Sequence, residues 1–376
     1  MRSRLVGIVA LATLLGVFAT GGRGIAAAQT YRVQLDAAPP PGQPWAFLKT
    51  FPTDHLALHT GDVINAAWAG SDTPHTATLV PTAHIGQWRG QNQQSGGPYA
   101  VFQPEPANDE KGAVLNSNVL APSDPSCGTE GNPCPFDGSA VVNSGLNFPN
   151  PNNQPSFFVT VTAPVGQYAL LCLLHPGMEI PLFVEAPGTD ILSPAEVAAH
   201  AAAEVGFYRR ILGPIADHRA QSVKRVGLPG GHTRFVITAG GFVANVSANE
   251  FRDKGLTLHV GDQLRVRANL EIHTATFPRG SFQSVPFTIP QCEVPGDNPD
   301  TFPPCSDPSL FELAFNGKAI TPSRHNGLFD PKHFVNSGLL GPIVPSYTFV
   351  ALKAGTYSMV CLVHGPEMSA TITIVP

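Results

Sequence analysis

The stretch "YALLCLLHPGM", residues 168–178, decides the fold. Leu170 and Cys172 alternate with their neighbours, and this period of two places them on one face of a β-strand. A proline and a glycine follow His175 at once and end the strand in a tight loop. Cys172, His175 and Met178 are therefore three soft or borderline metal ligands gathered at one strand end.

The chain contains a second copy of this stretch. "YSMVCLVHGPEM", residues 357–368, carries Cys361, His364 and Met368 at nearly the same spacing. Chance does not produce several ordered repeats, so we interpret the chain as a duplicated domain. Three further blocks repeat in the same order: "LALHTGD" at 56–62 and "LTLHVGD" at 256–262, "HTAT" at 75–78 and 273–276, and "VNSGL" at 142–146 and 335–339.

The composition favours an all-β protein. The 376 residues include 37 glycines and 38 prolines, and only 13% are charged, which favours short strands and turns over long helices. The length suits about two or three domains. The Gly-Asp pairs at 61–62 and 261–262 predict a turn between two strands in each copy.

A helix is predicted between the two copies, in "SPAEVAAHAAAEVGFYRRILGP", residues 193–214. Ser193 is its expected N-cap, Pro194 its first residue, and Gly213-Pro214 its expected end. We expect this helical connector to pack on one or both domains, with His200 and His218 facing solvent or packing rather than binding metal. Its apolar face is predicted to hold Val197, Ala201, Val205, Tyr208 and Ile211 or Leu212.

The first 28 residues have the pattern of an export signal. Arg2 and Arg4 precede an apolar run, and Ala26–Ala28 offers an Ala-x-Ala cleavage site. An uncleaved membrane anchor is the alternative, although the run is short for a span. Cleavage would remove three arginines and no acid, and the formal net charge would change from −5 to −8. The absence of a basic patch argues against a nucleic-acid partner.

Export implies an oxidising compartment, in which disulfides persist. Two of the six cysteines lie in the repeated motif. The other four form local pairs in loops rich in glycine, proline and aspartate, and we predict the disulfides Cys127–Cys134 and Cys292–Cys305. Other connectivities remain possible from sequence alone. This assignment leaves one free thiolate in each half.

A histidine upstream of each motif completes a possible metal site. The predicted ligands are His75, Cys172, His175 and Met178 in the first half, and His273, Cys361, His364 and Met368 in the second. Two imidazoles, one thiolate and a weak axial ligand make up a blue-copper centre. A single Cys-x-x-His could equally be a core cysteine followed by a loop histidine, but the repeated "HTAT" histidine favours the metal. Zinc is disfavoured because methionine is a poor zinc ligand.

The pattern G-x-Y-x-x-x-C-x-x-H with a following methionine and an upstream "HTAT" histidine resembles the plastocyanin/azurin family of cupredoxins. The resemblance covers about residues 30–187 and 230–376. It implies two tandem Greek-key β-sandwich domains, one-electron transfer at a type 1 copper in each, and electron passage through the edges of His175 and His364. The predicted organisation is a signal at 1–28, domains at 29–187 and 230–376, and a helical linker at 188–229.

Other residues give weaker signals. His59 and His259 match each other, but they stand beside the Gly-Asp turns, where a structural or solvated role is expected. His84 is a distant metal candidate only. Glu179 and Glu367 each neighbour a predicted axial methionine, and either could displace it.

Three functions agree with these features. The first is an exported electron-transfer protein, periplasmic or extracellular, with two type 1 coppers and redox partner proteins. The second is a copper store or delivery protein. The third is a two-domain multicopper oxidase or nitrite reductase. It is disfavoured because no His-x-His occurs and no histidine directly precedes Cys172 or Cys361.

Overall fold

The computed structural model describes most of the chain, including the strands of both sandwiches, the connector helices and the predicted ligands. The described residues are 27–37, 46–47, 51–68, 73–83, 100–103, 111–147, 155–175, 177–220, 223–244, 246–251, 253–268, 272–278, 285–292, 311–323, 327–329, 333–341 and 343–376. Residues 1–26 of the predicted signal at 1–28, which include its apolar run, and the candidate His84 lie outside them.

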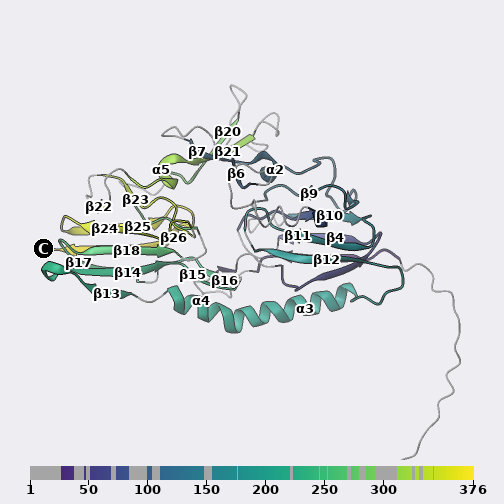
Figure 1. The fold of residues 1–376 in the computed structure, drawn as a ribbon, viewed down its shortest axis with the longest axis horizontal. Coiled ribbons are helices and arrows are strands. Elements are labelled where there is room, and N and C mark those ends of the chain that lie inside the picture. Colours follow the sequence, from purple (N-terminus) through teal and green to yellow (C-terminus); the bar gives the residue numbers. More distant parts are fainter. Residues whose placement is uncertain are drawn as a thin grey trace, which may run out of the picture.

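The first half is a sandwich of two sheets (Figure 1). Buried residues alternate with less buried ones along its strands, as β12 alternates half-buried and buried residues along its whole length, so that one face of each sheet lines a common core. One sheet has the order β1 (Thr30–Leu35), β4 (Val63–Trp68), β10 (Ser156–Val161), β8 (Cys134–Phe136). The other has the order β3 (Leu56–His59), β12 (Glu179–Glu185), β11 (Gly166–Leu171), β5 (Thr78–Val80), β9 (Val142–Asn143).

The second half repeats this arrangement with one additional edge strand, β13. The parallel pair β1–β4 returns as β14–β18, and the antiparallel pair β11–β12 returns as β25–β26. The prediction of an all-β fold with two tandem sandwiches is therefore confirmed. One sheet has the order β13 (Lys224–Gly227), β14 (Thr233–Ala239), β18 (Gln263–Ala268), β24 (Ser346–Ala351), β22 (Leu328–Phe329). The other has the order β17 (Gly255–His259), β26 (Gly365–Val375), β25 (Gly355–Cys361), β19 (Thr276–Phe277), β23 (Val335–Asn336).

The helical connector begins where the sequence predicts. α3 (Pro194–Phe207) has Ser193 as its N-cap and a complete capping box with Glu196. The predicted end at Gly213-Pro214 is wrong, because the π-helix η1 (Tyr208–Leu212) leads directly into α4 (Gly213–Ala220). Proline lacks an N–H, but the first turn of a helix needs no such donor, and the wider π-turn lets the axis continue. The strand β13 lies within the segment predicted as linker, so the second sheet begins before residue 230.

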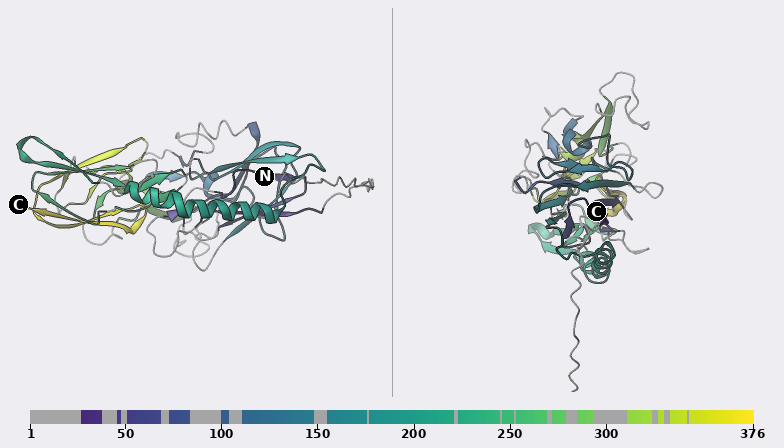
Figure 2. Two further views of the ribbon diagram at one scale, coloured as in Figure 1. Left: turned by 90° about the horizontal axis from the view of Figure 1, so that it is seen from below. Right: turned by 90° about the vertical axis from the view of Figure 1, so that its right-hand side faces the viewer.

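The connector packs on both halves, along one side of the molecule (Figure 2). Val197 joins the core of the first sandwich, while Tyr208 and Leu212 join a small cluster with Val246. Ile211 is 47% exposed, so Leu212 is the residue that completes the buried face. In the part of the chain that the structure describes, no helix combines the length and apolar character that a membrane span requires.

Two further sheets, antiparallel throughout, combine strands from both halves, and sequence analysis missed both (Figure 1). Leu174 of the first ligand loop packs against the cluster that contains Phe315, and His273 approaches Gly240, the residue before β15, so ligand-bearing parts of both sandwiches lie near this junction between the halves. The first sheet has the order β15 (Gly241–Val243), β16 (Val246–Ala248), β2 (Ala46–Phe47). The second has the order β20 (Thr288–Cys292), β21 (Phe311–Asn316), β7 (Lys111–Leu115), β6 (Phe102–Gln103). Three short helices complete the described elements: α2 (Ser117–Leu120), α5 (Gly317–Ile320) and η2 (Pro229–Gly231).

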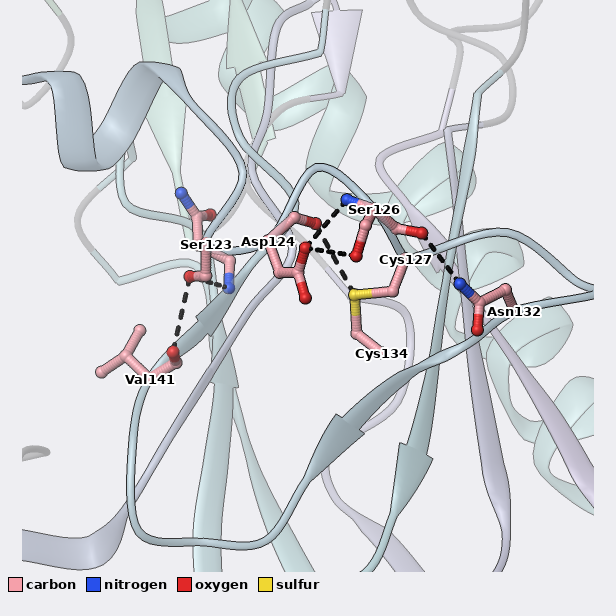
Figure 3. The surroundings of a disulfide bond; sticks show 8 residues. Ser123, Asp124, Ser126, Cys127, Asn132, Cys134 and Val141 are labelled. Atoms are coloured by element: carbon pink, nitrogen blue, oxygen red, sulfur yellow. Dashed lines mark hydrogen bonds between the residues drawn. A yellow bond between two sulfur atoms is a disulfide. The ribbon is translucent and has the colours of Figure 1, made fainter. Parts of the chain in front are cut away.

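The disulfide Cys127–Cys134 is present, as predicted, with its Cα atoms 5.0 Å apart (Figure 3). Asn132 donates to the Ser126 carbonyl beside it and closes the same loop. The predicted partner of Cys292, Cys305, lies outside the described residues, so the second disulfide stays a prediction.

Candidate metal centres

The fold brings together the three predicted donors of the first site. His75 lies just before β5, Cys172 directly follows β11, and His175 lies in the loop before β12. The Cys172 Sγ lies 3.7 Å from the Nδ1 atom of each histidine, and the two Nδ1 atoms are 3.0 Å apart. His75 and Cys172 are fully buried, while His175 is half-buried.

The second half builds the same group from His273, Cys361 and His364. The Cys361 Sγ lies 4.0 Å from His273 Nδ1 and 3.4 Å from His364 Nδ1. The two imidazole rings are 4.8 Å apart between their centroids, compared with 4.7 Å in the first half. In both groups the first histidine and the cysteine are buried, and the loop histidine reaches the surface.

The donor chemistry of both groups fits a transition metal. Two imidazole nitrogens and one thiol sulfur converge, and their ligand atoms all lie within 4.8 Å of one another. In the first group Asp36 faces the Nε2 atom of His75 at 3.2 Å. If Nε2 carries the proton and donates to this carboxylate, Nδ1 is left with its lone pair toward Cys172 and His175. Asp36 thus holds the His75 imidazole in the tautomer that a metal ligand requires.

The two methionines enter the same cores. Met178 and Met368 are 1% and 0% exposed and belong to the clusters that contain Cys172 and Cys361. The first loop is closed by hydrogen bonds from the Cys172 N–H to the Met178 carbonyl and from the Met178 N–H to the His175 carbonyl. Axial ligation by these methionines stays a prediction.

In the second half, most of the longer ligand loop belongs to strand β26, which begins at Gly365. Cys361 pairs with Gly365 after a register shift at Val360, and Met368 lies farther along β26. The neighbouring Glu179 and Glu367 are half-buried and exposed, and neither belongs to a ligand group.

The threonine after each upstream histidine positions the cysteine. The Thr76 N–H points at Cys172 Sγ at 3.4 Å, and the Thr76 hydroxyl accepts from the Leu173 N–H at 2.8 Å. Thr274 makes the same two contacts, at the same distances, with Cys361 and the residue after it. The repeated "HTAT" block therefore supplies a metal-ligand candidate and the clamp that fixes the thiol.

The "VNSGL" block supports that clamp from behind. Asn143 accepts from the Thr78 hydroxyl at 2.8 Å, and the Ser144 hydroxyl accepts from the Ala77 N–H at 2.9 Å. Asn336 and Ser337 repeat these contacts in the second half. Sequence analysis found the repeat but not this role, because the block lies more than 60 residues from its partners.

In the metal-free protein, His75 and Cys172 of the first centre shift each other's pKa. Burial would lower the pKa of His75, but the hydrogen bonds and charges of Asp36 and Cys172 raise it to about 9. Burial would raise the pKa of the Cys172 thiol, but its contacts with His75 and with backbone N–H groups lower it. Each partner favours the charged form of the other.

The second centre differs. Burial raises the pKa of the Cys361 thiol, and hydrogen bonds from the Thr274 and His364 backbone only partly offset it. Each half thus has its own set of the same ligand types and the same clamp, but the electrostatic surroundings of the two thiols differ.

The paired histidines at the turns make hydrogen bonds away from the ligand groups. The backbone N–H groups of His59 and His259 each donate to an aspartate, Asp62 or Asp262, at 2.8 Å. The His59 Nε2 also lies 3.1 Å from the Thr189 carbonyl. Neither histidine belongs to a ligand group among the described residues.

Asp36 is the site residue that sequence analysis missed. It stands outside all repeated blocks, 39 positions before His75. Its signal was a difference between the copies, since the equivalent position in the second half holds Gly240. A search for repeats finds what the halves share and passes over such a residue.

Comparisons with solved structures return copper proteins at low similarity. A variant of amicyanin in its Cu(I) form has 12% identity and a TM-score of 0.20, covering 38% of this chain and 82% of that one. Reduced auracyanin from Roseiflexus castenholzii has 11% identity and a TM-score of 0.25, covering 43% and 99%. Plastocyanin from Dryopteris crassirhizoma has 17% identity and a TM-score of 0.19, covering 37% and 99%. No protein-family description and no curated protein matches the chain.

Proposed function

We propose that this protein is an exported one-electron carrier with two mononuclear type 1 copper centres, one in each sandwich. The observation that carries the proposal is the duplicated group of two imidazoles and one thiol at matching strand ends. Copper bound there would supply reversible one-electron exchange between Cu(II) and Cu(I).

The protein's own residues are suited to that exchange. The thiols of Cys172 and Cys361 are fully buried and each is oriented by the N–H of a clamping threonine. Each clamping threonine lies two residues before a strand, β5 or β19, that pairs with the strand leading to the cysteine. Such a site changes its geometry little when its charge changes, and this keeps the cost of electron transfer low.

The half-buried loop histidines offer an exit to the surface. His175 and His364 are the members of each group that reach solvent. We propose that electrons enter or leave through their exposed edges, in contact with redox partner proteins that remain unidentified. Met178 and Met368 are the proposed axial ligands, and the buried position of each in the cysteine's own core supports this role.

The proposed location is the periplasm or the extracellular space. The Cys127–Cys134 disulfide supports an oxidising compartment. The N-terminal pattern of basic residues, apolar run and Ala-x-Ala supports export.

The deciding experiment combines metal analysis with an optical spectrum of the copper-loaded full chain. The proposal expects two coppers per chain and an intense thiolate-to-copper band that is lost on reduction and returns on reoxidation. A zinc-loaded sample is the colourless control. Binding without that band would favour the copper store, and turnover of oxygen or nitrite well above free copper would favour an enzyme.

A further inference from the structure

The two centres differ at one structurally equivalent position. Leu35, the last residue of β1, pairs with Trp68, and Ala239, the last residue of β14, pairs with Ala268 at the equivalent place. The next residue is Asp36 in the first half and Gly240 in the second. Both have φ 66°, in the left-handed region.

Asp36 is held in place by the surrounding structure. Positive φ is uncommon for a residue with a side chain and persists where neighbours fix it. Asp36 is 0% exposed, its Oδ1 accepts from the Ala37 N–H, and its Oδ2 faces His75 Nε2 at 3.2 Å. A buried carboxylate in an unfavourable backbone conformation, aimed at a candidate metal ligand, indicates a functional role.

At Gly240 the same role is sterically impossible. A Cβ atom built there would lie 2.4 Å from His273 Nε2 and 3.1 Å from the Ala248 carbonyl. The His273 imidazole therefore occupies the space in which a side chain would begin. Glycine is required here both by φ and by this close approach.

We propose that Asp36 holds the first centre at a lower reduction potential than the second, so that a single electron in the chain resides at the second centre. The inference rests on the proposed electron-transfer function and specifies its direction. A carboxylate that accepts the Nε2–H makes an imidazole a stronger donor. Its negative charge in a buried site also favours the more positive oxidised ion. At the second centre Gly240 can supply neither effect.

The junction between the halves places packed protein between the centres. Ala37, next to Asp36, shares a buried cluster with Val246 and Ala248, and the Ala248 carbonyl approaches Gly240. In a second cluster, Leu174 of the first ligand loop packs with residues of the second half, including Phe315. An electron that passes from the first centre to the second oxidises the first by one unit and reduces the second by one unit.

The test uses full-length chains with one blue centre each. Cys361→Ser keeps the first centre and Cys172→Ser keeps the second, and each is titrated with a one-electron redox buffer while the blue band is followed. We expect the second centre to hold an electron about tenfold more strongly, which is about 59 mV for a one-electron couple. Asp36→Asn or Asp36→Gly, added to the first-centre chain, should remove most of this difference. Glycine suits the backbone at this position, and circular dichroism of the metal-free chain checks folding.

Two controls separate Asp36 from other buried acids. Asp62 is a buried carboxylate at the opposite end of β4, and Asp62→Asn should leave the first potential unchanged. Glu250 is a buried acid whose backbone carbonyl accepts the Gly240 N–H. Glu250→Gln should leave the second potential unchanged.

Several results would overturn the inference. Equal potentials, a first centre with the higher potential, or no response to either Asp36 variant would contradict it while leaving two blue centres. If Glu250→Gln raised the reduction potential of the second centre as much as Asp36→Asn raises that of the first, a carboxylate would lower the potential at both centres, and the proposed difference would be wrong. If neither single-centre chain becomes blue with copper, the proposed function itself fails, and this inference with it.

Discussion

Asn143→Ala should destabilise the first sandwich strongly although Asn143 touches none of the ligands. The side chain is 2% exposed and sits behind the ligand clamp. Its Nδ2 donates to the carbonyls of Asn118 at 2.9 Å, Ala121 at 3.1 Å and Val119 at 3.4 Å, and its Oδ1 accepts from Thr78. These carbonyls end the short helix α2, whose last turn has no partners within the helix.

The magnitude follows from the three shortest bonds. A typical internal hydrogen bond contributes about 1 kcal/mol, so their loss should cost about 3 kcal/mol. With a urea dependence of about 2 kcal/mol per M, the unfolding midpoint should fall by about 1.5 M. A loss of about 3 kcal/mol is a large part of the free energy of unfolding of an ordinary domain, which is about 5–15 kcal/mol.

Tryptophan fluorescence suits the measurement. All three tryptophans of the chain, Trp45, Trp68 and Trp88, lie in the first half, and Trp68 is 1% exposed. Urea unfolding of metal-free protein, followed by this signal, therefore reports on the mutated sandwich. Asn336→Ala removes the same contacts in the second half and should cost a similar amount, measured by circular dichroism.

A matched surface change provides the control. Asn132 donates a single exposed hydrogen bond to the Ser126 carbonyl at 2.8 Å. Asn132→Ala should change the free energy of unfolding by less than about 0.5 kcal/mol. If Asn143→Ala cost no more than this control, the network behind the clamp would not stabilise the domain, and the reasoning would be refuted.

Four further outcomes are expected. Cys172→Ser should remove the blue band of the first centre and leave the second intact, and Cys361→Ser should do the reverse; loss of both bands from either change would mean that the centres share ligands. Met178→Leu and Met368→Leu should retain copper and raise the potential of the altered centre, since a donor is lost; release of copper on titration with a chelator would contradict this. Thiol titration of unfolded, metal-free protein should find two free thiols, and six would refute the disulfide pairing. The pKa of His75, about 9, lies above its ordinary value of 6.5. The stability that protonated His75 adds to the metal-free protein should therefore be full below about pH 6.5 and lost as pH rises through about 9. Urea unfolding midpoints that stay level over this pH range would contradict this.

The sequence by itself determined the strands and the candidate ligands. Local patterns carry this information: the alternation that ends at Cys172, the proline and glycine after His175, and the second copy of both. They need only the period of a strand and the preferences of a turn. The capping box at Ser193 was equally readable, because an N-cap and its partner are three residues apart.

Only the tertiary structure decided how these parts meet. His75 reaches Cys172 across 97 positions, and Asp36 reaches His75 across 39, because sheet pairing brings the strand ends together. The helix continues past Pro214 because a π-turn and packing on both halves outweigh the local stop signal. The exchange of Asp36 for Gly240 gained its meaning in the same way. The interaction of a carboxylate with an imidazole depends on their distance in space. The number of residues between them does not determine that distance; the fold does.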